Sequence, residues 1–151
     1  MFPTGVAGFT PRPIVTAWQS VVQSLPASTW TKVLYQSVLS DPLGLFANSR
    51  FTVPVAGAYM ITAGVHTVAA VDGTRAVLSV WKNGGGPAAS FANERRLIDG
   101  YSGAAGNIGI SGSCVFALVA GDYIEVFAYL GAALDTVNRE DVTAMSIFRL
   151  S

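Results

Sequence analysis

The sequence contains very little charge, and its few charged residues do not cluster. Only 12% of the 151 residues are charged, and the nine basic and nine acidic side chains give a net charge of zero. A typical soluble domain is about 25% charged. Proteins that bind nucleic acid need a concentrated positive surface that displaces counterions from the phosphates. Because the basic residues are scattered, we exclude nucleic acid as a partner.

The chain also has only one cysteine, Cys114, and one histidine, His66. A single cysteine cannot form an intrachain disulfide, and its apolar neighbours predict a buried, inert thiol. A Ser-His-Asp relay needs a carboxylate that holds the imidazole, and no nucleophile motif lies near His66. Metal sites with several Cys and His ligands are excluded by the same counts. We therefore predict no enzyme activity, no catalytic residue and no cofactor.

Calcium is the one metal that the composition leaves open. Three acidic residues, Asp135, Glu140 and Asp141, share one loop, and calcium requires clustered oxygen ligands. Arg139 stands among them, and the Asp-x-Asp-x-Asp-Gly pattern of a calcium loop does not occur. We predict a solvated loop without a metal, with calcium binding as the alternative.

A helical period and a membrane-spanning segment are both missing. The uncharged stretch 51–71 is long enough to cross a bilayer, but Pro54, Gly57, Gly64 and His66 interrupt it. Its ends carry no anchoring belt of aromatic and basic residues. The N-terminus also lacks the cationic region and apolar core of a signal peptide. We predict no membrane insertion.

Short runs of β-branched and aromatic residues, separated by turn residues, are what the sequence does contain. Asn83-Gly84 is the strongest hairpin signal, because both turn positions tolerate a positive φ. The predicted strands cover residues 14–25, 31–39, 50–55, 58–71, 74–82, 88–98, 106–119, 123–130 and 142–150. This number and spacing of strands predict an all-β domain of two packed sheets.

The first 13 residues differ from the rest, because prolines and glycines leave them little chance of forming a regular element. We predict an extended N-terminal arm over residues 1–13 and a single domain over residues 14–151. The low charge suggests that part of the domain surface is buried against copies of itself. The alternative is a monomer whose exterior is rich in serine and threonine.

Three blocks of the sequence resemble, in order, the domain family of C1q and tumour necrosis factor. In the first block, Phe51, Gly57 and Tyr59 match the Phe-x5-Gly-x-Tyr part of the C1q signature. Residues 118–126 resemble the family's Leu-x-x-Gly-Asp-x-Val-x-Val turn and strand, and residues 146–150 resemble its closing strand. The resemblance implies a two-sheet jelly-roll sandwich that assembles as a homotrimer.

The segment 123–130 alternates in a way that gives it two apolar faces. Its even-numbered residues are predicted to face the core of the monomer. The opposite face carries Glu125 among aromatic rings and is too aromatic to be left in water, so we predict that it contacts another subunit. The predicted trimer-interface residues are Tyr59, Tyr123, Phe127, Tyr129 and Phe148.

Two further segments, Trp18-Gln19-Ser20 and Trp30 to Tyr35, are similar to C1q-like domains of phage structural proteins. This resemblance implies a virion component assembled in the host cytoplasm. We predict a homotrimer that decorates or stabilises a phage capsid by binding the major capsid protein or another virion protein. The predicted attachment residues lie in the arm and are Phe2, Pro3, Phe9, Pro11, Arg12 and Pro13.

Two alternatives to capsid decoration stay open. The first is a receptor-binding tip of a phage tail or head fibre, which would bind a host surface glycan or protein through loops such as 84–89 or 131–141. The second is a free-standing, lectin-like binding module.

Overall fold

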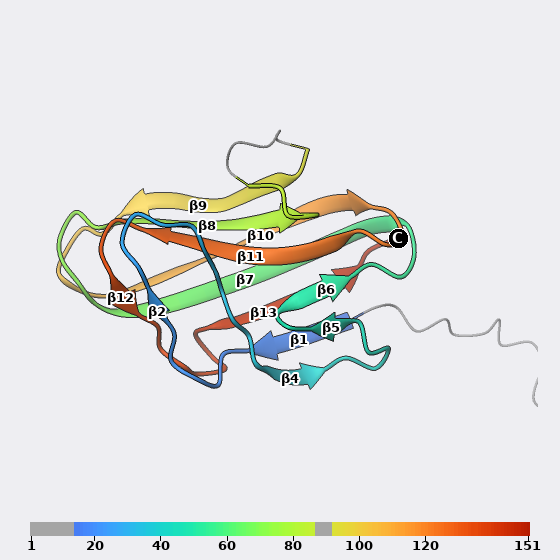
Figure 1. Ribbon diagram of the computed structural model, residues 1–151, viewed down its shortest axis with the longest axis horizontal. Coiled ribbons are helices and arrows are strands. Elements are labelled where there is room, and N and C mark those ends of the chain that lie inside the picture. Colours follow the sequence, from blue (N-terminus) through green and yellow to red (C-terminus); the bar gives the residue numbers. More distant parts are fainter. Residues whose placement is uncertain (1–13, 87–91) are drawn as a thin grey trace, which may run out of the picture.

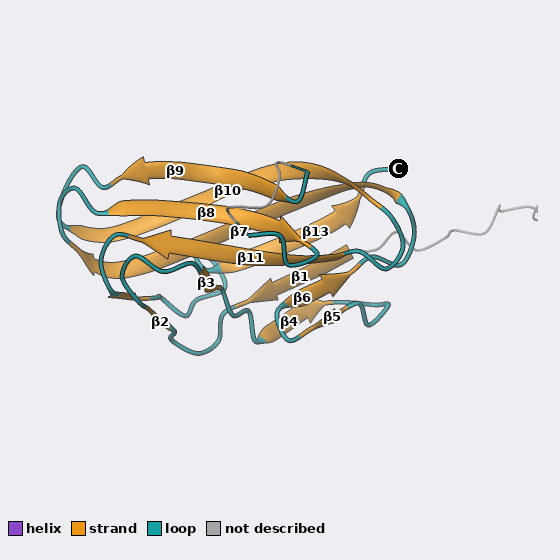
Figure 2. Ribbon diagram, turned by 45° about the horizontal axis from the view of Figure 1, so that its top comes forward, coloured by secondary structure: helices purple, strands orange, loops and turns teal. Residues whose placement is uncertain are grey.

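The structure, a computed structural model, describes residues 14–86 and 92–151 as a sandwich of two β-sheets (Figures 1 and 2). No helix occurs among these residues. A five-stranded sheet packs face to face against a six-stranded sheet, and a two-stranded sheet lies at one end. The all-β, two-sheet architecture predicted from the sequence is confirmed.

Each sheet combines strands that are far apart in the sequence. The five-stranded sheet contains, in spatial order, β10 (Gly106–Leu118), β7 (Gly57–Ala70), β13 (Ala144–Arg149), β1 (Ile14–Trp18) and β4 (Ser37–Ser40). The six-stranded sheet contains β5 (Phe46–Ala47), β6 (Arg50–Thr52), β11 (Tyr123–Leu130), β8 (Arg75–Lys82) and β9 (Glu94–Tyr101), with β3 (Thr31–Lys32) also paired to β11. The third sheet pairs β12 (Leu134–Asp135) with β2 (Ser24–Leu25).

The predicted long strand 14–25 is interrupted in the structure. Strand β1 ends at Trp18, and the next residue, Gln19, is completely buried. Its side-chain amide donates hydrogen bonds to the Leu34 carbonyl (3.1 Å) and the Gln23 side chain (3.2 Å). A buried amide needs such partners, and these bonds fix a loop between β1 and β2 where the apolar pattern predicted a continuous strand.

The uncharged stretch 51–71 contains the whole of β7, the longest strand of the five-stranded sheet, which lies between β10 and β13. In the part of the chain that the structure describes, no helix is long and apolar enough to span a bilayer. The Asn83-Gly84 turn was also predicted correctly, because both residues have positive φ values of 54° and 71° at the end of β8.

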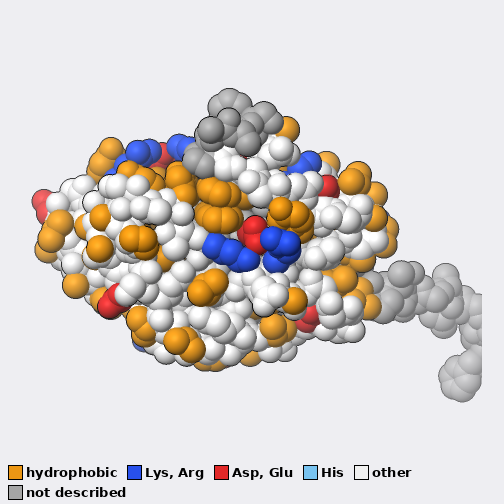
Figure 3. Space-filling model, in the orientation of Figure 1, with side chains coloured by type: hydrophobic (Ala, Val, Ile, Leu, Met, Phe, Trp, Pro, Cys, Tyr) orange, Lys and Arg blue, Asp and Glu red, His pale blue; other side chains and the backbone are white. Residues whose placement is uncertain are grey.

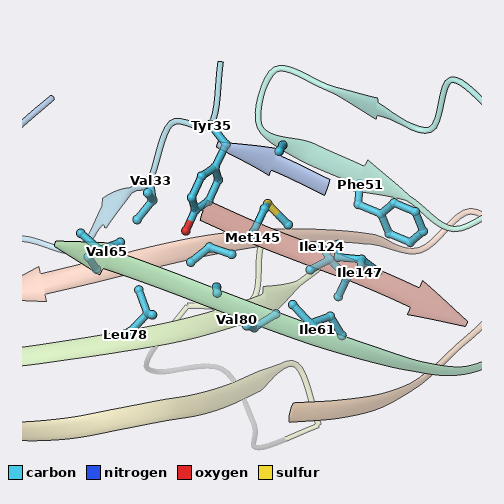
Figure 4. Packing of buried hydrophobic residues seen from close by; sticks show 14 of the residues in the cluster. Val33, Tyr35, Phe51, Ile61, Val65, Leu78, Val80, Ile124, Met145 and Ile147 are labelled. Atoms are coloured by element: carbon cyan, nitrogen blue, oxygen red, sulfur yellow. The ribbon is translucent and has the colours of Figure 1, made fainter. Parts of the chain in front are cut away.

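The core lies between the two sheets and draws buried side chains from both (Figure 4). Strand β11 shows the predicted alternation, since its four even-numbered residues from Ile124 to Leu130 are at most 1% exposed. Ile61 and Ile147 face them from the five-stranded sheet, where they lie opposite each other on β7 and β13. Alternation with a period of two thus assigns one face of each sheet to the core and leaves two outer faces.

Candidate functional site

The two outer faces differ sharply in charge. In the strands of the five-stranded sheet, Arg149 is the only charged residue, and its guanidinium donates a hydrogen bond to the Ala56 carbonyl at 2.8 Å. The strands of the six-stranded sheet carry Lys32, Arg50, Arg75, Lys82, Glu94, Arg95, Arg96, Asp99 and Glu125. Among the residues in strands, charge is therefore concentrated in the six-stranded sheet.

A row of apolar side chains crosses the outer face of the five-stranded sheet. Directly paired residues link Ile14 to Phe148, Phe148 to Met60, and Met60 to Val115, across β1, β13, β7 and β10. Paired residues of antiparallel strands project from the same face. Ile14 and Val115, at the two ends of this row, are 47% and 48% exposed. We call these four residues the apolar row.

A row of hydroxyl side chains lies beside the apolar row, two residues away from it on each strand. Thr16, Ser146, Thr62 and Ser113 occupy successive paired positions on the same four strands. The Thr62 and Ser113 hydroxyls are 2.9 Å apart, and those of Thr16 and Ser146 are 3.5 Å apart. Because these hydroxyls bond to one another, this part of the face can be covered without leaving buried hydroxyl groups unpaired.

Only one of the predicted interface residues, Phe148, lies in the apolar row. Tyr59 is fully buried in the core of the monomer, where its ring lies 5.7 Å from that of Phe51. Its hydroxyl donates a hydrogen bond to the Val55 carbonyl at 2.6 Å. Tyr59 has no surface to offer a partner, so the prediction for this residue is wrong. Its odd-numbered position on β7, in phase with the buried Ile61, is the signal that would have placed it inside.

The other three predicted residues, Tyr123, Phe127 and Tyr129, lie on the outer face of the opposite sheet. Phe127 stacks on Trp81 with ring centroids 3.7 Å apart, and Tyr129 lies 5.6 Å from Trp30. The sequence predicted that a partner covers these rings. In the structure, Trp81 packs against Phe127 and Trp30 packs against Tyr129. The sequence did not predict these contacts, because Trp30 and Trp81 lie in segments far from residues 123–130.

Glu125 stands in the middle of this aromatic face and is almost completely buried. One of its oxygens accepts bonds from Lys32 Nζ at 2.6 Å and from Arg50 Nε at 3.1 Å. The guanidinium of Arg50 also lies 4.0 Å from the centroid of the Tyr123 ring. Figure 3 shows basic atoms on both sides of an acidic atom near the middle of this face. One buried carboxylate thus holds two cations in place.

The lone histidine lies on the outer face of the five-stranded sheet. His66 and Asp141 line one hollow of about 340 Å³ together with Ser111. No hydrogen bond joins the imidazole to either side chain in the described part of the chain, and the Asp141 carboxylate pairs with Arg139 instead. A catalytic relay requires those hydrogen bonds, and this geometry does not supply them.

The acidic loop residues do not converge on one point. Asp135 accepts a hydrogen bond from Ser24, and Asp141 pairs with Arg139. Within residues 14–86 and 92–151, no three Asp, Glu, His or Cys side chains form a group that could hold a metal ion. The predicted attachment arm, residues 1–13, and part of the loop 84–89 lie outside the described residues.

Comparison with solved structures identifies the fold. The chain is similar to the globular domain of the zebrafish complement 1qA protein, with a TM-score of 0.65, 17% identity and coverage of 92% of this chain and 98% of that one. Murine APRIL aligns with a TM-score of 0.64 and 20% identity over 93% and 100% of the two chains. Eiger TNF from S. frugiperda aligns with a TM-score of 0.62 and 12% identity over 93% and 94%.

The fold is therefore the jelly roll of C1q and tumour-necrosis-factor domains, as the sequence predicted. At these identities the likeness establishes the fold and does not assign this chain to a particular member. No protein-family model matches the sequence, and no curated protein matches it significantly.

Proposed function

We propose that this protein is a non-enzymatic binding domain that works as a homotrimer, with the outer face of the five-stranded sheet as the contact between copies. The observation that carries the proposal is the apolar row on a sheet face with almost no charge. Exposed apolar surface that is continuous over several strands is typical of interaction sites. A face without charge can be buried without the large desolvation penalty of ions.

We propose three copies, and not another number, because the fold is similar to that of C1q and tumour-necrosis-factor domains. Sedimentation-velocity measurements on the purified full chain test it directly. A single species with three times the mass of the monomer, stable to dilution, is the expected result. A monomer at micromolar concentration would contradict the proposal.

The finer proposal is that the trimer is a structural component of a phage particle and decorates its capsid. Its support is the similarity of the segments around Trp18 and Trp30 to C1q-like domains of phage structural proteins. Three arms on one trimer would bind cooperatively, because the first attachment raises the effective concentration of the other two. Deletion of residues 1–13 should then abolish capsid binding and leave the trimer intact.

Immunogold labelling of intact particles from the source distinguishes the possible locations. Gold spread over the head is the expected result for a decoration protein. Gold confined to a tail tip or fibre end would favour the receptor-binding alternative. Absence of label from particles would contradict both virion roles and leave a free-standing binding module.

A further inference from the structure

The second candidate surface lies on the opposite side of the sandwich, where a hollow of about 560 Å³ opens beside the β5–β6 hairpin. It is lined by the polar residues Lys32, Asn48, Arg50 and Thr52 and by Gly44, Leu45 and Ala47. We call this the Arg50 hollow. No acidic side chain is among its lining residues.

The hollow carries an excess of positive charge. Lys32 and Arg50 share a single oxygen of Glu125, whose side chain is only 7% exposed, so one buried carboxylate neutralises one of two cations. Asp41, the acidic residue of the adjacent loop, directs its two oxygens to the backbone N–H groups of Leu45 and Phe46, both at 2.8 Å. It therefore stabilises the loop and does not pair with either cation.

The guanidinium of Arg50 is held in place but is only partly used. Its Nε is bonded to Glu125, and its plane lies over the Tyr123 ring, yet the side chain is 45% exposed. Neither terminal nitrogen of Arg50 donates a hydrogen bond to an acceptor in residues 14–86 or 92–151. The planar donor pair of a guanidinium matches the two oxygens of a carboxylate or phosphate. The guanidinium of Arg50 is thus fixed through Nε, while its two terminal nitrogens remain available to a ligand.

Lys32 is also oriented by the fold. Its Nζ donates to the Asn48 carbonyl at 2.7 Å as well as to Glu125. Asn48 and Ser49 form the tip of the β5–β6 hairpin with positive φ values of 51° and 56°. The hydroxyl of Ser49 fixes this turn by accepting from the Tyr35 N–H at 2.8 Å and donating to the Tyr35 carbonyl at 3.3 Å. Left-handed backbone at non-glycine residues persists only where the surroundings enforce it.

From this geometry we propose that the Arg50 hollow is a binding site for an oxyanion group, a carboxylate or a phosphate, carried by a ligand of this protein. Arg50 would hold the group through its two terminal nitrogens, and Lys32 would contribute charge from the side. The site lies on the six-stranded sheet, away from the proposed contact between copies. It therefore stands whether or not the protein is a trimer.

Inorganic phosphate and glucuronate are the probes, with glucose as the uncharged control. In the wild-type full chain, NMR signals of the Arg50 side chain should shift in a saturable way on titration with an anion and stay unchanged with glucose. Phosphate alone, glucuronate alone or both would support the site and identify its preferred group. No saturable shift with either anion would overturn the proposal.

Arg50→Lys is the informative variant, because it keeps a positive charge beside Glu125 and removes the planar guanidinium. It should weaken anion binding at least about tenfold, since a charged bidentate contact is lost, and the far-ultraviolet circular dichroism spectrum should be that of the wild type. Arg75→Lys is the matched control, because the Arg75 guanidinium already uses Nε and one terminal nitrogen in a two-point contact with Asp99, at 3.0 and 2.8 Å. If both variants bound the anion equally more weakly, or if Arg50→Lys bound it as tightly as the wild type, the terminal nitrogens of Arg50 would not be the anion's ligands.

Discussion

Met60 and Phe148 lie directly opposite each other on β7 and β13, at the centre of the apolar row on the outer face of the five-stranded sheet. Both are half-buried in the isolated chain. A methionine and a phenylalanine side by side on an uncharged sheet face form a surface that water solvates poorly. This relationship is the structural reason for expecting that copies of the chain associate through this face.

Met60→Glu should dissociate the assembly. The new carboxylate can be solvated in the monomer, but burial between copies would leave it without a cation of its own, because Arg149, the only charged residue in these strands, is bonded to the Ala56 carbonyl. Sedimentation velocity should show a monomer with an unchanged far-ultraviolet circular dichroism spectrum. Val71→Glu is the control, since Val71 is 62% exposed in the turn after β7. If Met60→Glu remains a trimer, the contact lies on another surface.

Gly57→Ala should destabilise the domain by about 1–3 kcal/mol, because it overfills a tight contact at the start of β7. A Cβ at this position would overlap the backbone oxygen of Ser151 and lie 2.6 Å from Arg149 Nε. Urea denaturation measures the loss. Gly100→Ala on β9 has nothing within 4 Å of the added carbon and should change the free energy of unfolding little. Equal stability of the two variants would show that the chain's C-terminal end moves away at no cost.

Asp122 should make stability depend on pH in the acid range. Its carboxylate accepts hydrogen bonds from the Val119 N–H at 2.9 Å and from Asn83 Nδ2 at 2.7 Å, and these bonds hold its pKa below the ordinary value. Because the pKa is lowered in the folded state, the ionised carboxylate stabilises the fold. This contribution to the free energy of unfolding is complete above the unfolded pKa of about 3.9 and is lost as pH falls through the folded pKa.

Asp122→Asn removes that contribution. We expect the free energy of unfolding at neutral pH to fall by about 1 kcal/mol. The difference between wild type and variant should shrink below about pH 4. Denaturant titrations over this pH range measure it, with Asp72→Asn in the exposed turn after β7 as the control. A difference that stays constant down to the lowest pH would rule out the carboxylate's charge as the cause.

Cys114 should react slowly with alkylating reagents. It packs against the core from β10, and burial raises the pKa of its thiol to about 11. Since the thiolate is the reactive form, labelling at mildly alkaline pH should be at least about tenfold slower in the folded protein than in urea. Mass spectrometry of timed samples gives both rates. Equal rates would mean that the strand opens on the timescale of labelling.

Local patterns in the sequence were sufficient to predict most strands. The odd-even alternation of residues 123–130 and the uncharged run that becomes β7 were assigned correctly, because the period of two is a property of the strand itself. The break after Trp18 was not predictable, since it depends on hydrogen bonds between Gln19 and segments that the fold brings near it.

The sequence by itself determined the fold class and the inward face of the strand 123–130, because burial selects the apolar side of an alternating segment. Only the tertiary structure decided which outward residues share a surface. Strand pairing over long sequence separations placed Ile14, Met60, Val115 and Phe148 in one row, and brought Lys32 and Arg50 to the same oxygen of Glu125. Sheet order and register are set by the packing of the whole chain, and no local window of the sequence contains them.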